Sequence, residues 1–331
     1  MKISSMTKNN SSEVIEVLTE AFNDYSIKIK GKPLEGKRKP ESIHPYLEIE
    51  PKGCFIASDR KEIIGAIFCH KWGKIGWIGT FGVLPKYQAK GIGKGLLVKA
   101  IEYLDKKCNV TTLGLETFPE NNLNIGLFSK CGFKPAFQTI KVVRPIIISP
   151  VKQDEFNNYS KNNKLEVALF SKEENKNDAY NRCSWLASKI ENGLDYNSEI
   201  KITEDYHLGD TILIKKEGFI IGYAICRTES KYQTSKENLE LDVKIAVLDR
   251  DFKDIKLLDY LLYVCEEFGH KKHKVQLKLG INSSYWLVYQ YFLQNNFRVK
   301  STILRMVKFS EDIKAYDRSN EWLVNCSSWT M

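Results

Sequence analysis

The sequence has no uninterrupted apolar run that approaches the roughly 18 residues of a membrane-spanning helix. Its first five residues, Met-Lys-Ile-Ser-Ser, are not followed by the apolar stretch of a secretory signal. Both absences argue against a membrane or exported protein. We therefore expect a soluble, cytoplasmic protein with no membrane partner.

Cysteine and histidine are nowhere grouped. The eight cysteines stand singly, with no Cys-x-x-Cys pair and no Cys/His cluster at the spacing of metal ligands. We interpret them as small buried hydrophobic residues or free thiols. No metal is expected.

A basic arm or tract is also lacking. Lys and Arg (50) exceed Asp and Glu (41), for a net charge of +9, but the two signs are interleaved along the chain. Interleaved charge is typical of a solvated surface. Because only the net charge favours a nucleic-acid partner, we expect none.

What is present is enough apolar sequence for two packed domains. The chain has 331 residues, of which 43% are hydrophobic. Residues 10–23 carry apolar side chains at helical spacing, and a short helix is expected near 41–49. Apolar runs at 54–57 and 63–69 flank a charged turn and predict a β-hairpin.

The same pattern occurs twice. A second hairpin is expected within 211–226, where Gly222 follows Gly65 by 157 residues. Residues 83–133 then match the chain 164 positions further on, without a gap. Such agreement predicts two copies of one α/β unit.

The repeat divides the sequence into four parts. Residues 1–148 form the first predicted domain, and residues 165–310 form the second. The polar, Asn- and Lys-rich residues 149–164 are expected to be a linker. Residues 311–331 are left as a C-terminal tail.

Residues 81–97 read as a strand, a turn marked by Pro85, and glycines that open an amphipathic helix. Glycine lets backbone approach a ligand closely, and unpaired amides at a helix N-terminus donate to phosphate oxygens. Lys90 and Lys94 add positive charge. The segment lacks the P-loop signature and the later glycine of a dinucleotide fingerprint. It predicts an anion-binding loop of another kind.

The whole string is more specific than its glycines. It resembles the acetyl-CoA-binding motif of the GNAT N-acetyltransferase superfamily: Val83-x-Pro85-x-x-Gln88-x-x-Gly91-x-Gly93. The likeness continues through the strand 113–116, Asn121 and the segment 127–133, and it covers roughly residues 1–148. The second copy resembles the same fold without the loop. The resemblance therefore implies a tandem GNAT-like acyl-CoA N-acyltransferase fold with a mixed, splayed sheet.

The resemblance also implies where acetyl-CoA binds. The pantetheine arm would pair with backbone near Val83 to Pro85, and the pyrophosphate would sit on the amides of 88–94. The Val83 amide would polarise the thioester carbonyl, and Asn121 would contact the cofactor arm. The implied cofactor-binding residues are Val83, Leu84, Pro85, Gln88, Ala89, Lys90, Gly91, Ile92, Gly93, Lys94, Gly95, Asn121 and Phe128. Acetyl would pass directly to an amine-bearing acceptor.

The chain departs from the family pattern at the catalytic groups. Phe128 occupies the position where the family usually has a tyrosine that protonates the leaving thiolate, which phenylalanine cannot do. The strand before Val83 offers no carboxylate, so Glu116 is the candidate base, aimed into the cleft if strand alternation holds. Glu116 is equally compatible with a structural carboxylate. His70 is a second candidate, and water could also remove the proton.

The second copy has lost the loop. Phe252, Ile255, Leu257 and Asp259 stand where the first copy has Gln88, Gly91, Gly93 and Gly95. We therefore expect no CoA binding there, and expect this copy either to close the acceptor cleft or to mediate homodimerisation. The acceptor would lie between residues 24–45 and the interdomain face. A non-catalytic acetyl-CoA-binding sensor or scaffold remains the alternative to an N-acetyltransferase.

Overall fold

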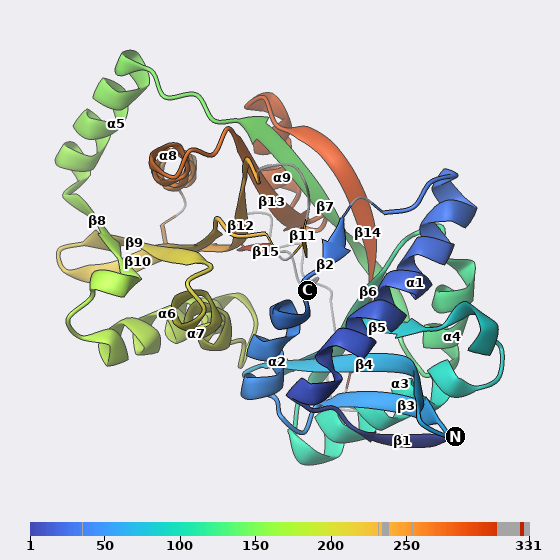
Figure 1. Ribbon diagram of the computed structural model, residues 1–331. Helices are drawn as coiled ribbons and strands as arrows, with labels where there is room; N and C mark the ends of the chain where they lie inside the picture. Colours follow the sequence, from blue (N-terminus) through green and yellow to red (C-terminus); the bar gives the residue numbers. More distant parts are fainter. Residues whose placement is uncertain (35, 231, 234–237, 253, 310–324, 328–331) are drawn as a thin grey trace.

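Two similar lobes lie side by side, joined by strands that run between them (Figure 1). The computed structural model describes residues 1–34, 36–230, 232–233, 238–252, 254–309 and 325–327. Within these ranges, no helix is both long enough and apolar enough to cross a membrane.

The first half contains these elements: β1 (Lys2–Ser5), α1 (Ser11–Lys30), β2 (Lys37–Arg38), α2 (His44–Ile49), β3 (Cys54–Asp59), β4 (Glu62–Trp72), β5 (Ile75–Val83), α3 (Ile92–Glu102), β6 (Thr112–Thr117), α4 (Asn122–Lys130) and β7 (Lys134–Pro145). The predicted helices and hairpin are confirmed. Helix α1 runs beyond the predicted 10–23 because no breaker occurs before Gly31, which ends it in a left-handed conformation (φ 70°).

The second half repeats this order: α5 (Pro150–Asn163), β8 (Leu165–Leu169), α6 (Lys176–Ile190), α7 (Asn197–Asp205), β9 (Gly209–Lys216), β10 (Phe219–Arg227), β11 (Tyr232–Gln233), β12 (Glu240–Leu248), α8 (Ile255–Lys271), β13 (Gln276–Asn282), α9 (Trp286–Gln294), β14 (Arg298–Phe309) and β15 (Asn325–Ser327). Helix α9 and strand β14 begin and end 164 residues after α4 and β7. The internal repeat is thus structural.

The hairpins show why the repeat keeps a glycine at one position. A Cβ added to Gly65 would lie 3.1 Å from Leu96 on α3, and one added to Gly222 would lie 2.4 Å from Leu248. At Gly65 the close neighbour belongs to helix α3, and at Gly222 it is the side chain opposite on the adjacent strand β12. A larger residue at either position would displace that neighbour.

Residues 149–164 do not form the extended linker that their composition suggested. Ser149 caps helix α5, its side chain accepting from the Lys152 amide, and Pro150 occupies the first turn. The ring of Phe156 is buried and stacks on Tyr263 of α8 at 4.5 Å. The segment predicted to be a linker is therefore a helix that packs on the second half.

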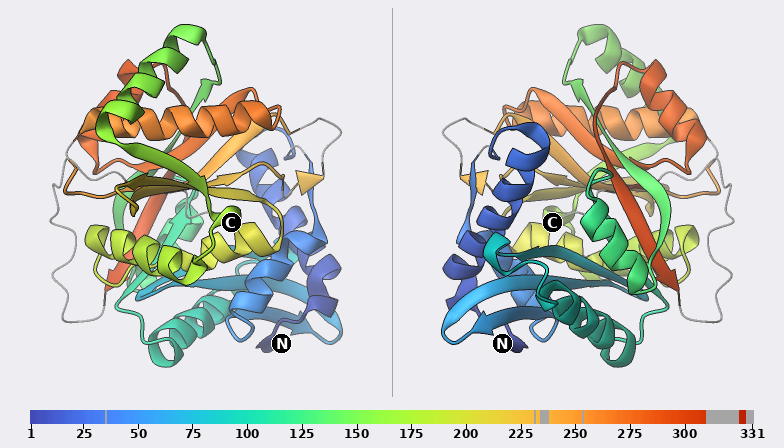
Figure 2. Two further views of the ribbon diagram at one scale, coloured as in Figure 1. Left: turned by 90° about the vertical axis from the view of Figure 1, so that its left-hand side faces the viewer. Right: turned by 90° about the vertical axis from the view of Figure 1, so that its right-hand side faces the viewer.

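One mixed sheet passes through both halves, and its order among the described strands is β1-β3-β4-β5-β6-β14-β7-β13-β12-β10-β9-β8. The last strands of the two halves are exchanged. Strand β14 pairs with β6 of the first half, with Arg305 opposite Glu116, and β7 pairs with β13 of the second half. The two exchanged strands also pair with each other, as the side view shows (Figure 2). The predicted boundaries at 148 and 165 therefore do not separate two self-contained sheets.

A core at the junction also joins the halves. Trp72 and Trp77 of the first half pack in one buried cluster with Tyr196 and Tyr223 of the second. The ring centroids of Trp72 and Tyr196 are 6.1 Å apart. Buried aromatic surface of this kind holds two lobes firmly together.

Candidate active site

Two neighbouring parallel strands of the first half part company midway. Strands β5 and β6 pair from Ile75 with Thr112 to Ile78 with Leu115, where the pairing of these fully described strands ends. Beyond that point β5 continues to Val83, paired only with β4. The edge of β5 that faces β6 is therefore open along residues 79–83, as the predicted splayed sheet requires.

A left-handed turn and an uncapped helix follow this open edge. Ala89 (φ 61°) and Gly91 (φ 80°) are both left-handed, and Gly91 is the N-cap of α3 without a side-chain cap bond. An added Cβ at Gly91 would meet nothing within 4 Å, so the space above the helix start is open. First-turn amides and the positive end of the helix dipole are thus presented to an anion.

Side-chain contacts hold the first part of the loop between β5 and α3, at residues 86–88. Gln88 donates from Nε2 to the Val83 carbonyl at 3.0 Å, which ties the loop to the end of β5. Lys86 and Tyr87 both bond the Glu62 carboxylate, at 2.7 and 2.8 Å. The cradle is therefore held in place before any ligand arrives.

The remaining predicted cofactor residues surround this cradle. Lys90 and Lys94 are exposed beside the helix start, and Gly93 lies against Phe81, whose ring would be 3.1 Å from an added Cβ. Asn121 caps α4, its Oδ1 accepting from the Asn124 amide at 3.0 Å, which leaves its amide nitrogen and the second lone pair of Oδ1 for a cofactor arm. Leu84, Pro85, Ile92 and Gly95 complete the set along the loop and the first turn of α3.

Phe128 is part of the hydrophobic core. Its ring is 4% exposed, with centroids 6.2 Å from Phe81 and 6.5 Å from Phe133. The position brings it under the open edge of β5, but its side chain has no proton to give.

Glu116 does not face an open cleft. Its side chain is 1% exposed, and Oε1 accepts from Thr139 on β7 and, at 3.2 Å, from Arg305 on β14. The structure places Glu116 against the exchanged strand β14, which the sequence did not predict as its neighbour. This burial matches the structural alternative for Glu116, and a catalytic role stays a prediction. A carboxylate already engaged by two donors is a poor general base.

His70 is likewise part of the packing. It is 6% exposed, and its Nε2 donates to the Gly79 carbonyl at 2.5 Å. Burial lowers its pKa to about 4, against the opposing charge of Glu199. A neutral, buried imidazole with so low a pKa is a weak base at pH 7.

Two contacts of the segment before α2 and of α1 were not foreseen. Arg38 donates to the Thr80 hydroxyl at 3.2 Å, which places a guanidinium on the open part of β5. Tyr25 of α1 stacks on Phe118, just after β6, with centroids 5.0 Å apart. These residues border the strand edge from the α1 side. Isolated residues in a polar stretch gave no periodic signal that could have found them.

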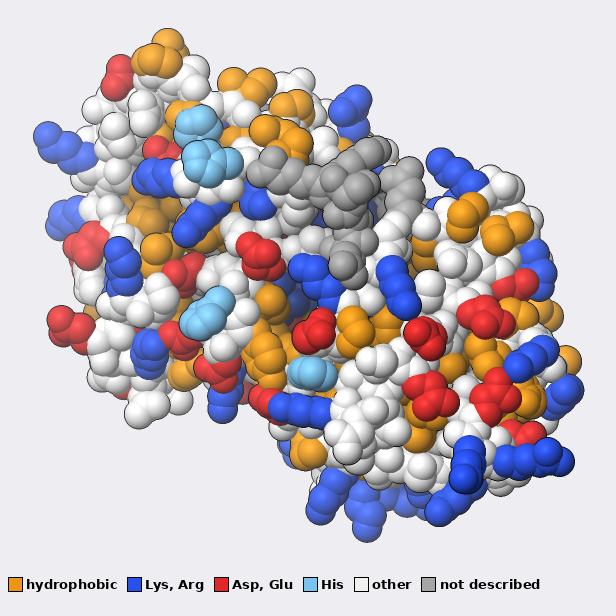
Figure 3. Space-filling model, in the orientation of Figure 1, with side chains coloured by type: hydrophobic (Ala, Val, Ile, Leu, Met, Phe, Trp, Pro, Cys, Tyr) orange, Lys and Arg blue, Asp and Glu red, His pale blue; other side chains and the backbone are white. Residues whose placement is uncertain are grey.

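An acidic groove runs along the exposed side of α1. Acidic side chains gather over α1 on the face seen in Figure 3. The open groove there has a volume of about 540 Å³. It is lined by Glu16, Thr19, Glu20, Asn23, Asp24, Ile27, Lys37 and Pro85. It reaches the end of β5 through Pro85. Lys37 pairs with Glu16 at 3.5 Å and Lys28 with Asp24 at 2.7 Å, so part of the acidic charge of this groove is already balanced.

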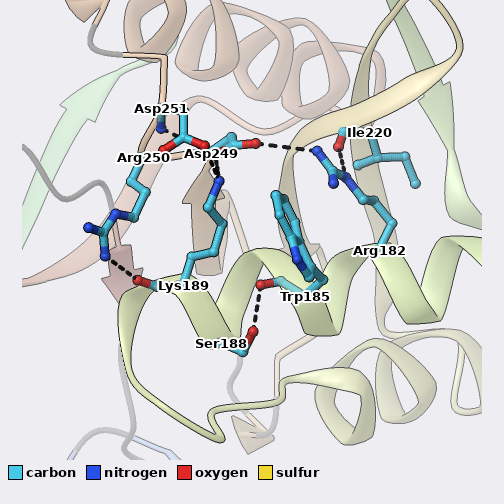
Figure 4. A network of polar contacts seen from close by, with 8 residues as sticks. All are labelled: Arg182, Trp185, Ser188, Lys189, Ile220, Asp249, Arg250 and Asp251. Atoms are coloured by element: carbon cyan, nitrogen blue, oxygen red, sulfur yellow. Dashed lines mark hydrogen bonds and ion pairs between the residues drawn. The ribbon is translucent and has the colours of Figure 1, made fainter.

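In the second half, ion pairs hold the segment that follows β12, the counterpart of the loop after β5. Asp249 accepts from Lys189 at 2.6 Å and from Arg182 at 3.3 Å, so the end of β12 is pinned to α6 (Figure 4). Trp185 lies between these two cations, 3.9 Å from the Arg182 guanidinium carbon. Asp254 caps α8, accepting from the Lys256 amide at 2.8 Å. A carboxylate thus caps the start of α8, whereas the start of α3 in the first half has no side-chain cap.

No group of three His, Cys, Asp or Glu residues that could hold a metal ion occurs within the described part of the chain.

Comparison with known proteins shows similarity to acetyltransferases. Residues 15–133 match the model of the acetyltransferase (GNAT) family. N-alpha-acetyltransferase 30 of Xenopus laevis is 34% identical over 103 residues, which are 29% of this chain and 37% of the relative. The chain thus spans little more than a third of that relative's length.

The solved structures extend the likeness to the full length. A proposed acetyltransferase of Pyrococcus horikoshii is 16% identical with a TM-score of 0.64, covering 99% of this chain and 94% of its own. A tandem GNAT protein from the clavulanic acid biosynthesis pathway is 11% identical with a TM-score of 0.58, covering 93% and 98%. At such identities the likeness shows the fold. Residues 15–133 are thus similar to the GNAT acetyltransferase family, and the whole chain shares its fold with a tandem GNAT protein.

Proposed function

We propose that the chain transfers an acetyl group from acetyl-CoA to a primary amine, using the first half alone as its cofactor site. The observation that carries this proposal is the uncapped, left-handed start of α3 at Gly91 beside the open edge of β5. An elongated cofactor with a pyrophosphate at one end and hydrogen-bonding amides along its arm fits both features at once. A free phosphate would need only the start of α3 and not the open edge of β5.

The chain's own residues would act by binding and orientation. Bound acetyl-CoA supplies a thioester, whose carbonyl would accept a hydrogen bond from the backbone amide of Val83. The amine must attack in its neutral form, so a proton has to leave. Because Glu116 and His70 are both engaged in packing, we propose that water reaching the open strand edge removes it.

The acidic groove along α1 supports an amine as the acceptor class. Glu16, Glu20 and Asp24 line it on the α1 side of the sheet. The opposite side carries α3, because the Cβ of Gly82 would meet Leu18 of α1 while that of Gly65 would meet Leu96 of α3. Acceptor and cofactor would then approach β5 from opposite faces.

The test is acetyl-CoA binding by calorimetry together with thiol release against amines, polyamines, amino acids and peptides. Gly91→Glu places a carboxylate at the anion cradle and should weaken binding by about 100-fold or more, the equivalent of one or two charge-assisted hydrogen bonds. Gly218→Glu is the matched control, since Gly218 has a similar φ of 82°, equally open space and a distant position in the β9–β10 hairpin. Equal weakening by both variants would contradict the proposal.

A binding protein without turnover is the second candidate. The observation in its favour is Phe128, which lies under the open strand edge with no proton to donate. Acetyl-CoA binding that is lost in Gly91→Glu, together with no thiol release on any acceptor, would establish a sensor or scaffold instead of a transferase.

A further inference from the structure

The sheet of the second half parts in the same way as that of the first. Strands β12 and β13 pair in parallel from Glu240 with Gln276 to Val243 with Leu279. Beyond Val243, β12 runs on to Leu248 away from β13. Each half therefore has a strand whose edge is left without its parallel neighbour.

This second edge is occupied by the chain itself. Strand β15 pairs with β12 antiparallel, Ile245 opposite Ser327 and Val247 opposite Asn325. Residues 245–247 stand 164 positions after residues 81–83, which are the open edge of β5. The C-terminal strand thus lies on the counterpart of the edge proposed for the pantetheine arm.

The end of β12 and the start of α8, next to this second edge, are unsuited to a phosphorylated ligand. Asp249 is pinned by Lys189 where the first half has Pro85, and Asp254 caps α8 with its own carboxylate. Negative charge and a side-chain cap replace open amides. A peptide strand needs no anion site, because its affinity comes from main-chain hydrogen bonds along the edge.

We propose that strand β15 takes the place of a cofactor arm in the second half. It pairs with the edge of β12 that corresponds to the open edge of β5 and so blocks that edge to a cofactor. The chain consequently offers one acyl-CoA site. The inference concerns the second half and holds whether or not the first half transfers acetyl groups.

Hydrogen exchange of the full-length chain tests it. Asn325→Pro combined with Cys326→Pro removes two consecutive amides, and because facing directions alternate along a strand, one of them faces β12 in either phase. Amides of residues 245–247 that face β15 rather than β10 should exchange about 100-fold faster in this variant, as for a strand edge that loses its partner. Asn325→Ala combined with Cys326→Ala keeps both amides and should leave the rate unchanged.

Residues 81–83 serve as the internal comparison. The amides there that face away from β4 should exchange fast in both variants and slowly when acetyl-CoA is added. A failure there would count against the proposed function alone. Unchanged exchange at 245–247 in the double-proline variant would overturn the inference about β15.

Discussion

The indole of Trp72 donates to the carboxylate of Glu199 at 3.1 Å, across the junction of the two halves. Glu199 is 2% exposed, and its other oxygen accepts from Arg227 at 2.8 Å. Burial alone would raise the pKa of Glu199, but the charges of Arg227 and Lys244 outweigh it and hold the pKa below its usual value. A first-half side chain thus completes the hydrogen bonding of a second-half ion pair.

Removing either partner of this relationship should loosen the whole chain. Glu199→Ala leaves the Arg227 guanidinium buried without its counter-charge and should lower the free energy of unfolding by about 3–5 kcal/mol. Trp72→Phe keeps the ring and removes one donor, so about 1–3 kcal/mol is expected. Urea unfolding measures both. Glu155→Ala, at an exposed pair with Lys256, is the control and should change nothing measurable.

Acid should destabilise the protein partly through His70. Its folded pKa is about 4 and its unfolded value about 6.5, so the unfolded chain binds the additional proton between these pH values. Stability therefore rises with pH through this window, is complete above about 6.5, and is lost as pH falls toward 4. His70→Gln should reduce the loss by up to about 3 kcal/mol when unfolding curves at pH 7 and pH 4.5 are compared. An identical pH dependence in the variant would contradict the assignment.

Glu116→Gln separates a structural carboxylate from a catalytic one. Without the charge, Arg305 is left buried beside a neutral amide, and the unfolding free energy should fall by about 3 kcal/mol. The kcat of the folded fraction should stay within a factor of two of the wild type. A kcat lowered by orders of magnitude at unchanged stability would restore Glu116 as the base.

Two glycines make a matched pair for packing. A Cβ at Gly114 would lie 1.9 Å from the buried ring of Trp77, so Gly114→Ala should prevent the native junction from forming. Gly126 lies within α4 with nothing within 4 Å, and Gly126→Ala should instead stabilise by about 0.5–1 kcal/mol. Thermal unfolding of the two variants should shift in opposite directions, and a harmless Gly114→Ala would contradict the packing at Trp77.

The first half should not stand alone. Residues 1–148 lack β14, which pairs with β6 and β7 at the centre of the sheet. Expressed by itself, this fragment should aggregate or associate, because an open central edge recruits other strands. Size-exclusion chromatography decides the matter, and a monodisperse, cooperatively folding monomer would be the contrary result.

How much the sequence could reveal depended on how local each signal was. The loop from Val83 to Gly93 could be predicted because its glycines, proline and glutamine lie in one short contiguous stretch of the sequence. Helix α5 was missed because Phe156 is its one buried residue, with Tyr159 packed beside the same core, so no apolar stripe marks the helix. Ser149 and Pro150 are nevertheless ordinary start signals.

The strand exchange could not be found in the sequence. Strands β7 and β14 occupy equivalent places in the repeat, so their patterns fit either half equally well. The burial of Glu116 follows from the exchange and was hidden with it. Contacts such as Trp72 with Glu199 join residues 127 positions apart and leave no periodic trace.

Because the strands are exchanged, the sheet of the first half cannot be completed until β14 has been synthesised. Glu116 meets Arg305 only after 189 further residues have been added. At translation rates of about 5–20 residues per second, the nascent first half waits about 10 to 40 s with the edge of β6 uncovered. During that interval the unpaired edge of β6 is exposed to chaperones and to the unpaired strands of other chains. Pairing with β14 then covers β6 and β7 together.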